Sequence, residues 1–389
     1  MRKYQQLLLL LFSFTSLILV LVYRHEYNRL HYVLEVFNFF GTPCNFSELR
    51  TSDKRLDHFD WGQNPVWQQN GEYQIFSAFS NNSYAQVIAV VKKVSKMPKK
   101  CILWHEDENP TTASISSLKI ADSDGLEAYI FSCGFKYHKI PPYAVSIGFS
   151  SKNFTPQKII LTHIEKSDFV KATVCVPPST YNKRELVEFL SFHSLIGFKY
   201  FILYYDDIPY SLLKFLSNLS KILEIDFTFY PWNFPFNSSG LIRSIIEKDC
   251  LLRTFGKSES SIVLAFNEYL IPLDSYGIYP LFQKGNHSFE SINIPVQAMC
   301  IKTNETFYPI AVQNTNSYDD GEMRVVKFHF NTNVKNTKTN DKNSDQMVVH
   351  SYKYCKGYTG PFKSERSMSM YSTDFSRSLL VRLLTHNEI

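Results

Sequence analysis

Residues 172–266 alternate short apolar runs with amphipathic stretches, and this alternation restricts the fold more than any other feature of the sequence. The apolar runs have the length and the β-branched or aromatic content of buried strands, and they span residues 172–177, 200–205, 223–230 and 262–266. The stretches between them have helical periodicity, at 182–196, 210–219 and 241–255. Strands that alternate with helices pair in parallel, because each helix carries the chain back across the sheet. The sequence therefore predicts an α/β domain with a mainly parallel sheet.

Two of these helices carry signals at their ends. Asn182 and Glu185 have the spacing of a capping box, and Gly197 follows the last helical residue. Gly256 ends the third helix in the same way. His193 lies on the apolar face of the first helix, where a hydrogen-bonded core histidine is expected rather than a ligand or a base.

The third helix places two opposite charges on its apolar face. Asp249 lies within the arc of Ile242 and Ile246, and Arg253 follows four residues later on the same face. A carboxylate and a guanidinium at this spacing must pair, because either one alone would be a costly buried charge. The pair would fix the helix against the sheet, or it would place Arg253 near a phosphate group of a ligand.

The last of the four predicted strands ends in Asn267 and Glu268. In open α/β sheets, ligands bind at the carboxyl ends of the strands. An amide and a carboxylate at this point are hard to explain by packing, since apolar residues resume at 270–272. We expect both side chains to face a ligand site, and the alternative is a strand end at which Glu268 faces water.

The amino-terminal sequence predicts a membrane anchor. Residues 7–23 are apolar, and a helix needs roughly 17–25 such residues to cross a bilayer. Arg2 and Lys3 precede this run, so the tail at 1–6 is expected in the cytosol and the bulk of the chain in the lumen. A cleaved signal peptide is the alternative, but the run does not end in the small residues that cleavage requires. An uncleaved signal anchor followed by a stem at 24–65 is therefore favoured.

The glycosylation sequons and the cysteines all follow this apolar segment. Asn-x-Ser/Thr sequons agree with a lumenal, glycosylated domain and occur at Asn45, Asn81, Asn153, Asn218, Asn237, Asn286 and Asn304. The 7 cysteines lack the close paired spacing of a zinc site, so disulfides are expected, with one thiol left free or bridging two chains. Cys44 in the stem is the candidate for the odd thiol, which would give a disulfide-linked dimer.

The rest of the chain divides into regions that differ in composition. Residues 66–166 contain short apolar runs separated by Asn, Pro, Ser and Asp, which predicts a β-rich N-terminal lobe before the α/β domain at 167–360. Residues 331–345 have too little apolar content to pack and predict a loop. Residues 361–389 predict a tail with a helix at 373–384. The net charge of +5 is mild and Lys and Arg form no long run, so a nucleic acid partner is not expected.

Several motifs taken together resemble glycosyltransferase family 92. They are Val174-Cys-Val-Pro-Pro, the helix from Glu185 to Gly197, the strand Phe198-Lys-Tyr-Phe-Ile-Leu-Tyr, Asp249-Cys-Leu-Leu-Arg253 and Phe266-Asn-Glu-Tyr-Leu-Ile-Pro272. The similarity extends over roughly residues 70–355. It implies a Golgi type II membrane enzyme whose GT-A-like domain has a mixed, mainly parallel sheet flanked by helices. It also implies a nucleotide sugar as donor, UDP-galactose in characterised members, a glycan acceptor, and Mn²⁺ or Mg²⁺.

The metal motif of that family, Asp-x-Asp-Glu, is degenerate in this chain. Two carboxylates at alternate residues would hold the cation against the oxygens of the leaving diphosphate. The matching positions are Ala265, Phe266, Asn267 and Glu268, of which Ala265 offers no ligand and Asn267 only a neutral carbonyl. Three outcomes follow: a metal-independent enzyme in which Arg or Lys stabilises the diphosphate, a weakened metal site rebuilt from Asn267, Glu268 and His350, or a fold that no longer catalyses.

Other residues complete the candidate site. Asp320 lies in an acidic cluster with Asp319 and Glu322, in a predicted loop, and is the candidate base for the acceptor hydroxyl. Arg253 and Asp249 join Asn267 as candidates for the nucleotide-sugar site. The expected function is transfer of a hexose such as galactose to a glycan in the Golgi or the endoplasmic reticulum. The alternatives are a lumenal binding protein with a glycosyltransferase fold and a cell-surface glycoprotein with a structural role.

Overall fold

The computed structural model of the chain describes most of the sequence from Trp67 to Ser378. The described residues are 14–16, 18–19, 67–80, 83–93, 96–106, 109–135, 141–148, 157–163, 170–179, 183–206, 212, 215–216, 219–220, 224–236, 238–274, 277–278, 291–301, 309–328, 341–355 and 360–378. The chain divides into two compact units, Met1–Val66 and Trp67–Ile389. The second unit contains both sheets and all of the candidate site.

In the first unit the structure describes helical residues at 14–16 and 18–19. The predicted membrane span at 7–23 therefore lies mostly outside the described residues, and the tail at 1–6, the stem at 24–65 and Cys44 lie wholly outside them. Among the residues that are described, no helix is long and apolar enough to cross a membrane. The asparagines of the sequons are also outside the described ranges.

Within the described residues, nine strands form the first sheet of the second unit, which we call the N-terminal sheet. The strand order is β1-β2-β3-β6-β5-β4-β7-β8, and β9 pairs with β2. The strands are β1 Gln68–Asn70, β2 Tyr73–Ser80, β3 Tyr84–Lys92, β4 Lys100–Trp104, β5 Thr111–Ser123, β6 Leu126–Gly134, β7 Ala144–Gly148, β8 Ile159–Ile160 and β9 Thr162–His163. Nearly all of them pair antiparallel, as a β-rich region of short strands requires.

The N-terminal sheet curls around its own hydrophobic core. Val87, Leu103, Phe131 and Val145, from four different strands, are fully buried in one cluster. A disulfide joins Cys101 in β4 to Cys133 in β6, with 5.9 Å between the Cα atoms. Strands separated by one intervening strand lie about 10 Å apart in a flat sheet. The shorter distance therefore requires the sheet to bend at β5, which brings β4 over β6.

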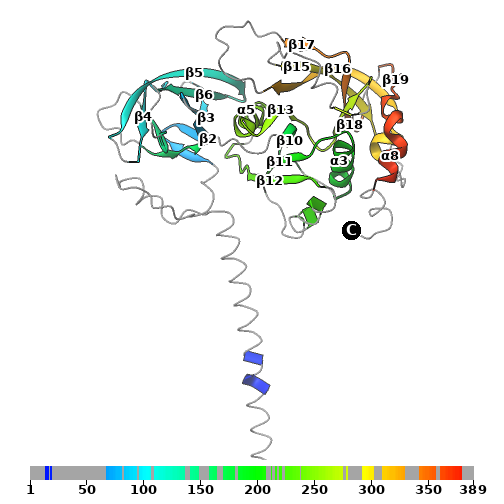
Figure 1. Cartoon of the computed structure of the whole chain (residues 1–389), viewed down its shortest axis with the longest axis horizontal. Helices are drawn as coiled ribbons and strands as arrows, with labels where there is room; N and C mark the ends of the chain where they lie inside the picture. The colour runs from blue at the N-terminus through cyan, green and yellow to red at the C-terminus, as the bar shows by residue number, and fades with distance from the viewer. Residues whose placement is uncertain are drawn as a thin grey trace, which may run out of the picture. The chain divides into compact units, whose positions relative to one another are not determined.

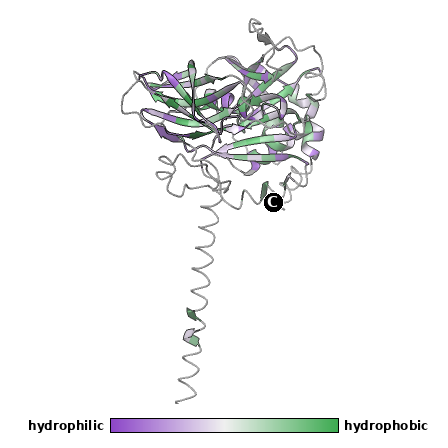
Figure 2. Ribbon diagram, turned by 60° about the vertical axis from the view of Figure 1, so that its left-hand side comes forward, coloured by the Kyte–Doolittle hydropathy of each residue, from purple (hydrophilic) through white to green (hydrophobic). Residues whose placement is uncertain are grey.

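The described residues form a second, ten-stranded sheet, which we call the C-terminal sheet, in the order β12-β11-β10-β13-β16-β15-β18-β14. Two short strands are added at its side, β17 on β15 and β19 on β16. The strands are β10 Val170–Val176, β11 Tyr200–Tyr205, β12 Asp226–Pro231, β13 Ser258–Val263, β14 Glu268–Pro272, β15 Ser291–Cys300, β16 Asn316–Phe328, β17 Asp341–Asn343, β18 Met347–Lys353 and β19 Lys363–Ser364. Figure 2 shows apolar residues along the strands of both sheets.

The prediction of a mainly parallel sheet needs correction. The four strands β12, β11, β10 and β13 are parallel, as the alternation of strands and helices indicates. From β13 onwards the ladders are mixed, with antiparallel pairs β13–β16, β16–β15 and β18–β14. Among the residues described between Val263 and β19, no long helix separates successive strands, and most of the later pairs run antiparallel. Together with the N-terminal sheet, this makes the unit strand-rich.

Helices cover the C-terminal sheet on both faces. They are α3 Lys183–Leu195, α5 Ile242–Thr254, α7 Ile310–Gln313, the 3-10 helix η1 Ser367–Tyr371 and α8 Ser372–Arg377. α3 packs against β14 and α8. Of the predicted helix at 210–219, the structure describes helical residues at 212, 215–216 and 219. Of the predicted helix at 373–384, it describes the part up to Arg377 as α8.

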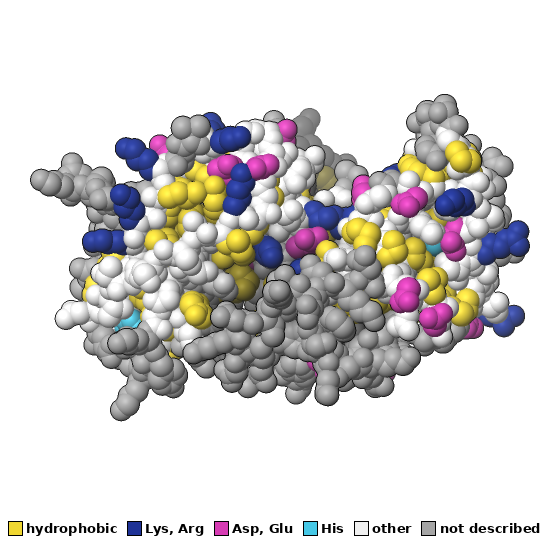
Figure 3. All heavy atoms as spheres, turned by 90° about the horizontal axis from the view of Figure 1, so that it is seen from above, with side chains coloured by type: hydrophobic (Ala, Val, Ile, Leu, Met, Phe, Trp, Pro, Cys, Tyr) yellow, Lys and Arg dark blue, Asp and Glu magenta, His cyan; other side chains and the backbone are white. Residues whose placement is uncertain are grey.

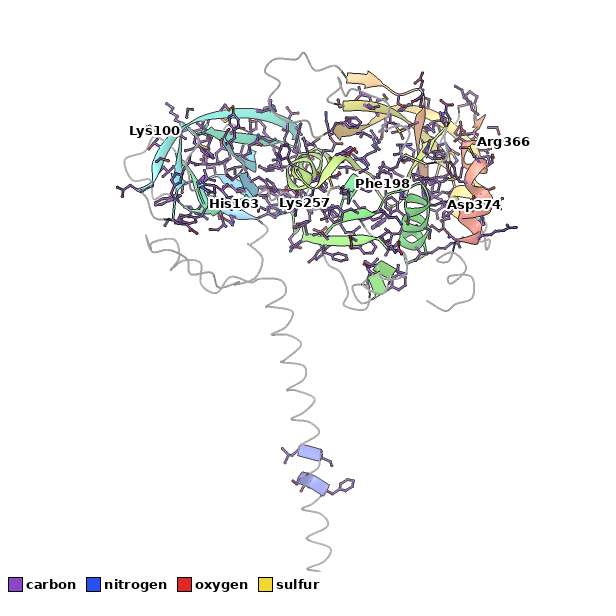
Figure 4. All side chains as sticks on the ribbon, in the orientation of Figure 1. Lys100, His163, Phe198, Lys257, Arg366 and Asp374 are labelled. Carbon is purple, nitrogen blue, oxygen red and sulfur yellow. A yellow bond between two sulfur atoms is a disulfide. The ribbon has the colours of Figure 1, made fainter. Side chains whose placement is uncertain are left out.

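α5 lies between the two sheets (Figure 1). It contacts β10 and β13 of the C-terminal sheet and β2, β3 and β5 of the N-terminal sheet. A disulfide between Cys175 in β10 and Cys250 ties the helix to the central strand. The turn that follows α5 uses Gly256, with φ 80°, before Lys257, which is labelled in Figure 4. A left-handed φ favours glycine at this point, which confirms the predicted end of the helix.

The described cysteines form three disulfides inside the chain. In addition to Cys101–Cys133 and Cys175–Cys250, a third bond joins Cys300 at the end of β15 to Cys355 beyond β18. The prediction that cysteines serve as disulfides is confirmed for these residues.

Candidate functional site

The C-terminal sheet changes the direction of its strand order at β10. β11 and β12 lie on one side of β10 and β13 lies on the other, and all four strands are parallel. Their carboxyl ends therefore meet at one edge, and in open α/β sheets ligands bind in the crevice outside that edge. Three segments leave strands there: Asp206 after β11, residues 232–241 between β12 and α5, and residues 264–267 after β13.

A pocket of about 480 Å³ lies at this edge. Its lining residues follow β11 and β12 and reach the first residue of α5; they are Asp206, Trp232, Asn233, Phe234, Phe236, Ser238, Ser239 and Ile242. The rings of Trp232 and Phe234 are 5.4 Å apart, and those of Phe234 and Phe236 are 5.5 Å apart. Aromatic walls with a few polar groups are typical of small-molecule sites of this size.

Trp232 lines this pocket and carries a buried hydrogen-bond donor. Its side chain is 1% exposed, and its indole N–H has no acceptor in the part of the chain that the structure describes. The backbone of Trp232 is held firmly, because its N–H donates to the Tyr205 carbonyl at 2.6 Å and its carbonyl accepts from the indole of Trp67. A buried N–H without a partner costs about 1–3 kcal/mol. An oxygen atom of a bound ligand would supply the missing acceptor.

Glu268 is buried in an ion-pair cluster. Nη2 of Arg243 lies 2.9 Å from each of its carboxylate oxygens. Arg324 donates from Nε at 2.9 Å and from Nη2 at 2.5 Å to Oε1, and the backbone N–H of Ala265 donates to Oε2 at 2.9 Å. Neither predicted position for this carboxylate, facing a ligand or facing water, describes what the structure shows.

The charges of this cluster keep Glu268 ionised. Burial alone would raise the pKa of Glu268, but the charges of Arg243 and Arg324 and their hydrogen bonds outweigh burial and lower this pKa. Arg324 also pairs with the half-exposed Glu322 at 2.7 Å. Arg243 is 30% exposed and donates from Nη1 to the Val263 carbonyl at the end of β13. The cluster thus holds one partly exposed guanidinium at the carboxyl edge of the sheet.

The structure does not bring together the three predicted metal ligands Asn267, Glu268 and His350. The exposed Asn267 donates from Nδ2 to the Tyr352 carbonyl at 2.9 Å. His350 pairs with Tyr269 between β18 and β14, and side chains alternate along a strand, so His350 and Glu268 lie on opposite faces. The imidazole of His350 is fully buried, its Nε2 lies 3.2 Å from Ser367 Oγ, and burial lowers its pKa to about 4.

This donor set does not fit a divalent cation. The oxygens of Glu268 already accept hydrogen bonds from two guanidinium groups, whereas Mn²⁺ and Mg²⁺ prefer unpaired carboxylate oxygens. Ala265 supplies no ligand, and Asn267 at most one neutral oxygen. Across the described ranges, no group of three or more His, Cys, Asp and Glu side chains is placed to hold a metal ion.

Asp249 and Arg253 form the ion pair that their spacing predicts. Nε and Nη2 of Arg253 donate to the Asp249 carboxylate at 2.8 and 3.0 Å. The same carboxylate accepts from Tyr204 at 2.5 Å and from Ser77 of the N-terminal sheet at 2.6 Å. The guanidinium carbon lies 3.7 Å from the ring centre of Tyr230. The pair therefore anchors α5 between the two sheets, which is the structural one of its two predicted roles.

The acidic cluster at Asp319, Asp320 and Glu322 lies within the long strand β16 and not in the loop that the sequence predicts. Asp319 accepts a hydrogen bond from the Gly321 N–H at 2.9 Å, and Gly321 has φ 73°, so the strand bulges here. Glu322 is engaged with Arg324. The side chain of Asp320 is outside the described residues.

Sequence reasoning missed the pocket and both arginines. Asp206 follows an apolar strand directly, and this was the available signal for a strand-end carboxylate. Trp232 and Phe234 lie in a segment without regular structure, where aromatic residues give no periodicity. Arg324 lies 56 residues from Glu268 in sequence, so no local pattern links the two.

One family model matches part of the chain. Residues 170–354 match the model of glycosyltransferase family 92. This match covers the C-terminal sheet except β19, and it does not cover the N-terminal sheet, to which the sequence resemblance also extended. Such enzymes transfer glycosyl groups, and GT-A-like members generally use nucleotide sugars as donors.

No curated protein matches the chain. Among solved structures, the crystal structure of S. aureus TarS 1-349 has 9% identity and a TM-score of 0.24, over 54% of this chain and 66% of that chain. A superposition this loose carries no structural argument. The comparison with family models therefore shows that residues 170–354 of this chain are similar to glycosyltransferase family 92.

Proposed function

We propose that the chain transfers a hexose such as galactose from a UDP-sugar to a glycan acceptor. The observation that carries this proposal is the pocket at the carboxyl edge of the parallel strands. Its lining residues include Asp206 and Trp232, and the buried indole N–H of Trp232 has no acceptor among the described residues. The pocket is bordered by Ile242, the first residue of α5. A helix N-terminus favours a negatively charged group such as a diphosphate.

The lining of the pocket suits a uracil base. Uracil has one ring N–H between two carbonyl oxygens, so Asp206 would accept from the N–H and Trp232 would donate to an oxygen. Phe234 and Phe236 offer ring faces on which a flat base can stack. Cytosine lacks the ring N–H and carries its donor on the exocyclic N4 instead, so it cannot reproduce the contact from the ring N–H to Asp206, and UDP should bind more tightly than CDP.

Glycosyl transfer breaks the bond between the sugar C1 and the diphosphate oxygen, while the acceptor hydroxyl attacks C1 and loses its proton. Negative charge develops on the leaving diphosphate and must be stabilised. In this proposal Arg243 supplies that stabilisation, since it is partly exposed beside the end of β13 and is oriented by Glu268 and the Val263 carbonyl. Glu268 then acts as a positioning residue. Asp320 stays the proposed base.

The direct test is a transfer assay with purified full-length protein. UDP-galactose and UDP-glucose would be offered with a panel of glycan acceptors, in Mn²⁺ and in EDTA. We expect transfer or slow donor hydrolysis that EDTA does not abolish. Activity that is lost completely in EDTA would contradict the role given to Arg243, and the absence of both reactions in every condition would count against an enzyme.

A binding protein without catalysis is the second candidate, and the saturated carboxylate of Glu268 favours it. A protein of this kind would keep the nucleotide pocket and lose the groups that promote bond cleavage. Restoring the family motif with Ala265→Asp and Asn267→Asp should then make UDP binding depend on Mn²⁺, which is not expected of the native chain. If the double variant binds UDP with the same affinity as the native chain, and Mn²⁺ does not change that affinity, this result contradicts the second candidate.

The location proposed for the chain is the membrane of the Golgi or the endoplasmic reticulum, with the enzyme domain in the lumen. The apolar residues 7–23 and the sequons that follow them support this proposal. Peptide N-glycosidase treatment should shift the mobility of the protein, and microscopy should place it with an early-Golgi marker. Unshifted mobility or a plasma-membrane location would oppose it.

A disulfide between two copies of Cys44 would give a dimer. Non-reducing electrophoresis of the native chain and of Cys44→Ser tests this dimer.

A further inference from the structure

The wall of the pocket is formed by residues 232–239, of which the described residues 232–236 and 238–239 belong to no strand or helix. It runs from the end of β12 towards α5, and most of its described residues line the pocket. A loop of this kind needs outside contacts to hold one conformation, because fixing each residue costs about 1–2 kcal/mol of conformational entropy. Several of those contacts come from the N-terminal sheet, which lies outside the family segment 170–354.

The hairpin between β5 and β6 reaches this wall. Its turn residues Asp124 and Gly125 have φ of 53° and 73°, the left-handed pair that a tight hairpin turn requires. Oδ2 of Asp124 accepts hydrogen bonds from Ser238 Oγ at 2.7 Å and from Ser123 Oγ at 2.9 Å. A Cβ at Gly240 would come within 2.8 Å of the Cβ of Ser123, so the close approach depends on glycine at that position.

Trp67 and Phe76 hold the aromatic part of the wall. The indole of Trp67 donates to the Trp232 carbonyl, and its ring lies 5.0 Å from that of Phe234. The ring of Phe76 in β2 lies 4.8 Å from that of Trp232, nearly edge-on. These contacts fix the backbone and the ring plane of Trp232, which lines the pocket.

Adhesion between the two sheets does not explain these contacts. The sheets are already joined through α5, where Ser77 of β2 donates to the buried Asp249. The Asp124 side chain, by contrast, is exposed and bonds directly to a residue that lines the pocket. A contact at that place affects the shape of the pocket more than the packing of the core.

We propose that the N-terminal sheet completes the nucleotide pocket and that Asp124 and Trp67 are its positioning residues. This inference rests on the proposed function for the identity of the ligand, a uridine nucleotide, but not for the ordering of the wall. It assigns the sheet outside the family segment a part in donor binding, although none of its described residues lines the pocket.

The test compares three variants of the full-length chain by UDP calorimetry. Asp124→Gly keeps the left-handed φ and removes the acceptor, whereas Asp124→Asn tolerates the same φ and keeps an acceptor oxygen. We expect Asp124→Gly to weaken UDP binding about tenfold, the effect of one hydrogen bond to a charged group, and Asp124→Asn to stay within about threefold of the native chain. Asp122→Asn is the control, since Asp122 lies two residues before Asp124, in β5, and pairs with Lys119 and not with the wall.

A second measurement needs no nucleotide. Hydrogen exchange at the amides of residues 232–241 should be faster in Asp124→Gly than in Asp124→Asn or Asp122→Asn. Trp67→Phe, which keeps a ring and loses the donor to the Trp232 carbonyl, should also speed this exchange. Because this readout is independent of UDP, it separates a failure of the positioning role from a failure of the proposed function.

The outcomes are distinct. If the native chain binds no UDP, the proposed function fails, and the exchange data alone decide whether Asp124 and Trp67 order the wall. Unchanged exchange in both Asp124→Gly and Trp67→Phe overturns the inference. Equal UDP affinity in the native chain and in Asp124→Gly overturns it as well. An equal loss of affinity in Asp122→Asn would show a general effect of the hairpin and would contradict a specific role for Asp124.

Discussion

At the scale of single residues, Glu268 shows how a residue from a catalytic motif can serve a structural role. It keeps the sequence position of the family motif, as the first residue of β14, but its two oxygens are occupied by Arg243, Arg324 and the Ala265 N–H. A buried carboxylate without these partners would be costly, and the buried guanidinium of Arg324 without the carboxylate would be costly as well. The substitution of the two motif aspartates and the pairing of Glu268 are therefore consistent with each other.

Glu268→Gln should destabilise the fold strongly. The amide keeps the size of the side chain but removes the buried counter-charge that Arg243 and Arg324 share, and it leaves Arg324 with only the half-exposed Glu322. Breaking a buried pair in this way costs about 3–5 kcal/mol. Urea denaturation measures this loss as a change in the free energy of unfolding. Asp226→Asn, at an exposed carboxylate at the start of β12, is the control and should change stability far less. A loss below about 1 kcal/mol would contradict the account of the cluster.

The same cluster predicts that the free energy of unfolding depends on pH. The pKa of Glu268 is lowered below its usual value of 4.5, so the unfolded chain binds this proton at a higher pH than the folded chain does. Its contribution to stability is then present above pH 4.5 and is lost as the pH falls through the folded pKa. The native chain should lose more unfolding free energy below pH 4.5 than Glu268→Gln does. Parallel curves for the two proteins would argue against the lowered pKa.

The titration of His350 predicts a second change of stability with pH, at higher pH values than that of Glu268. Burial lowers its pKa from 6.5 to about 4, so between these values the unfolded chain takes up a proton that the folded chain does not. Stability should therefore fall as the pH is lowered from 6.5 to 4. His350→Gln should show a smaller fall over this interval, as measured by urea denaturation at several pH values. If the stability of His350→Gln falls as much as that of the native chain, burial does not lower the pKa of His350.

At the scale of elements, α5 connects the candidate site to the rest of the molecule. It is tied to β10 by Cys175–Cys250 and to β2 through Asp249 and Ser77, and its first turn carries Arg243. The helix thus fixes the position of the guanidinium at the edge of the sheet. Its amphipathic pattern and its charges were sufficient to predict the helix and its ion pair.

Removal of the Cys175–Cys250 disulfide should loosen this arrangement. Replacing both cysteines with alanine opens a loop of 75 residues, for which a loss of about 2–5 kcal/mol is expected. The temperature of unfolding should fall, and UDP affinity should fall with it because Ile242 and Arg243 lie at the start of α5. Replacing Cys101 and Cys133 in the N-terminal sheet is the comparison, and it should lower stability with less effect on affinity. Equal effects on affinity would contradict the link through α5.

The elements that the sequence could predict are those with strong periodicity. Runs such as 85–91 and 200–205 are buried strands and were recognised as such. β5 was missed because its 13 residues are rich in Ser and Thr and mostly exposed, so apolar alternation is weak. β13 ends at Val263, earlier than the apolar run suggests, since residues 266–267 form a turn. Turns inside apolar sequence leave no signal in composition.

At the scale of the whole molecule, the candidate site is shared between parts that are distant in sequence. Glu268 meets Arg324 of β16, and Trp232 meets Trp67 and Phe76 of the N-terminal sheet. The sequence could place the strand ends at one edge, because topology follows from the alternation of elements. It could not give the partners across the pocket, because those depend on how the two sheets pack.

On the face seen in Figure 3, acidic, basic and apolar side chains are mixed, with no broad field of one charge.

The central claim is that the edge of the C-terminal sheet holds a uridine diphosphate without a divalent cation. Calorimetric titration of UDP into the full-length protein, in EDTA and then in Mn²⁺, tests it most directly, with CDP as the control ligand. We predict that UDP binds in EDTA, that Mn²⁺ changes its affinity by less than about threefold, and that CDP binds more weakly. Binding that appears only with Mn²⁺, or no binding of UDP in either condition, would contradict this account.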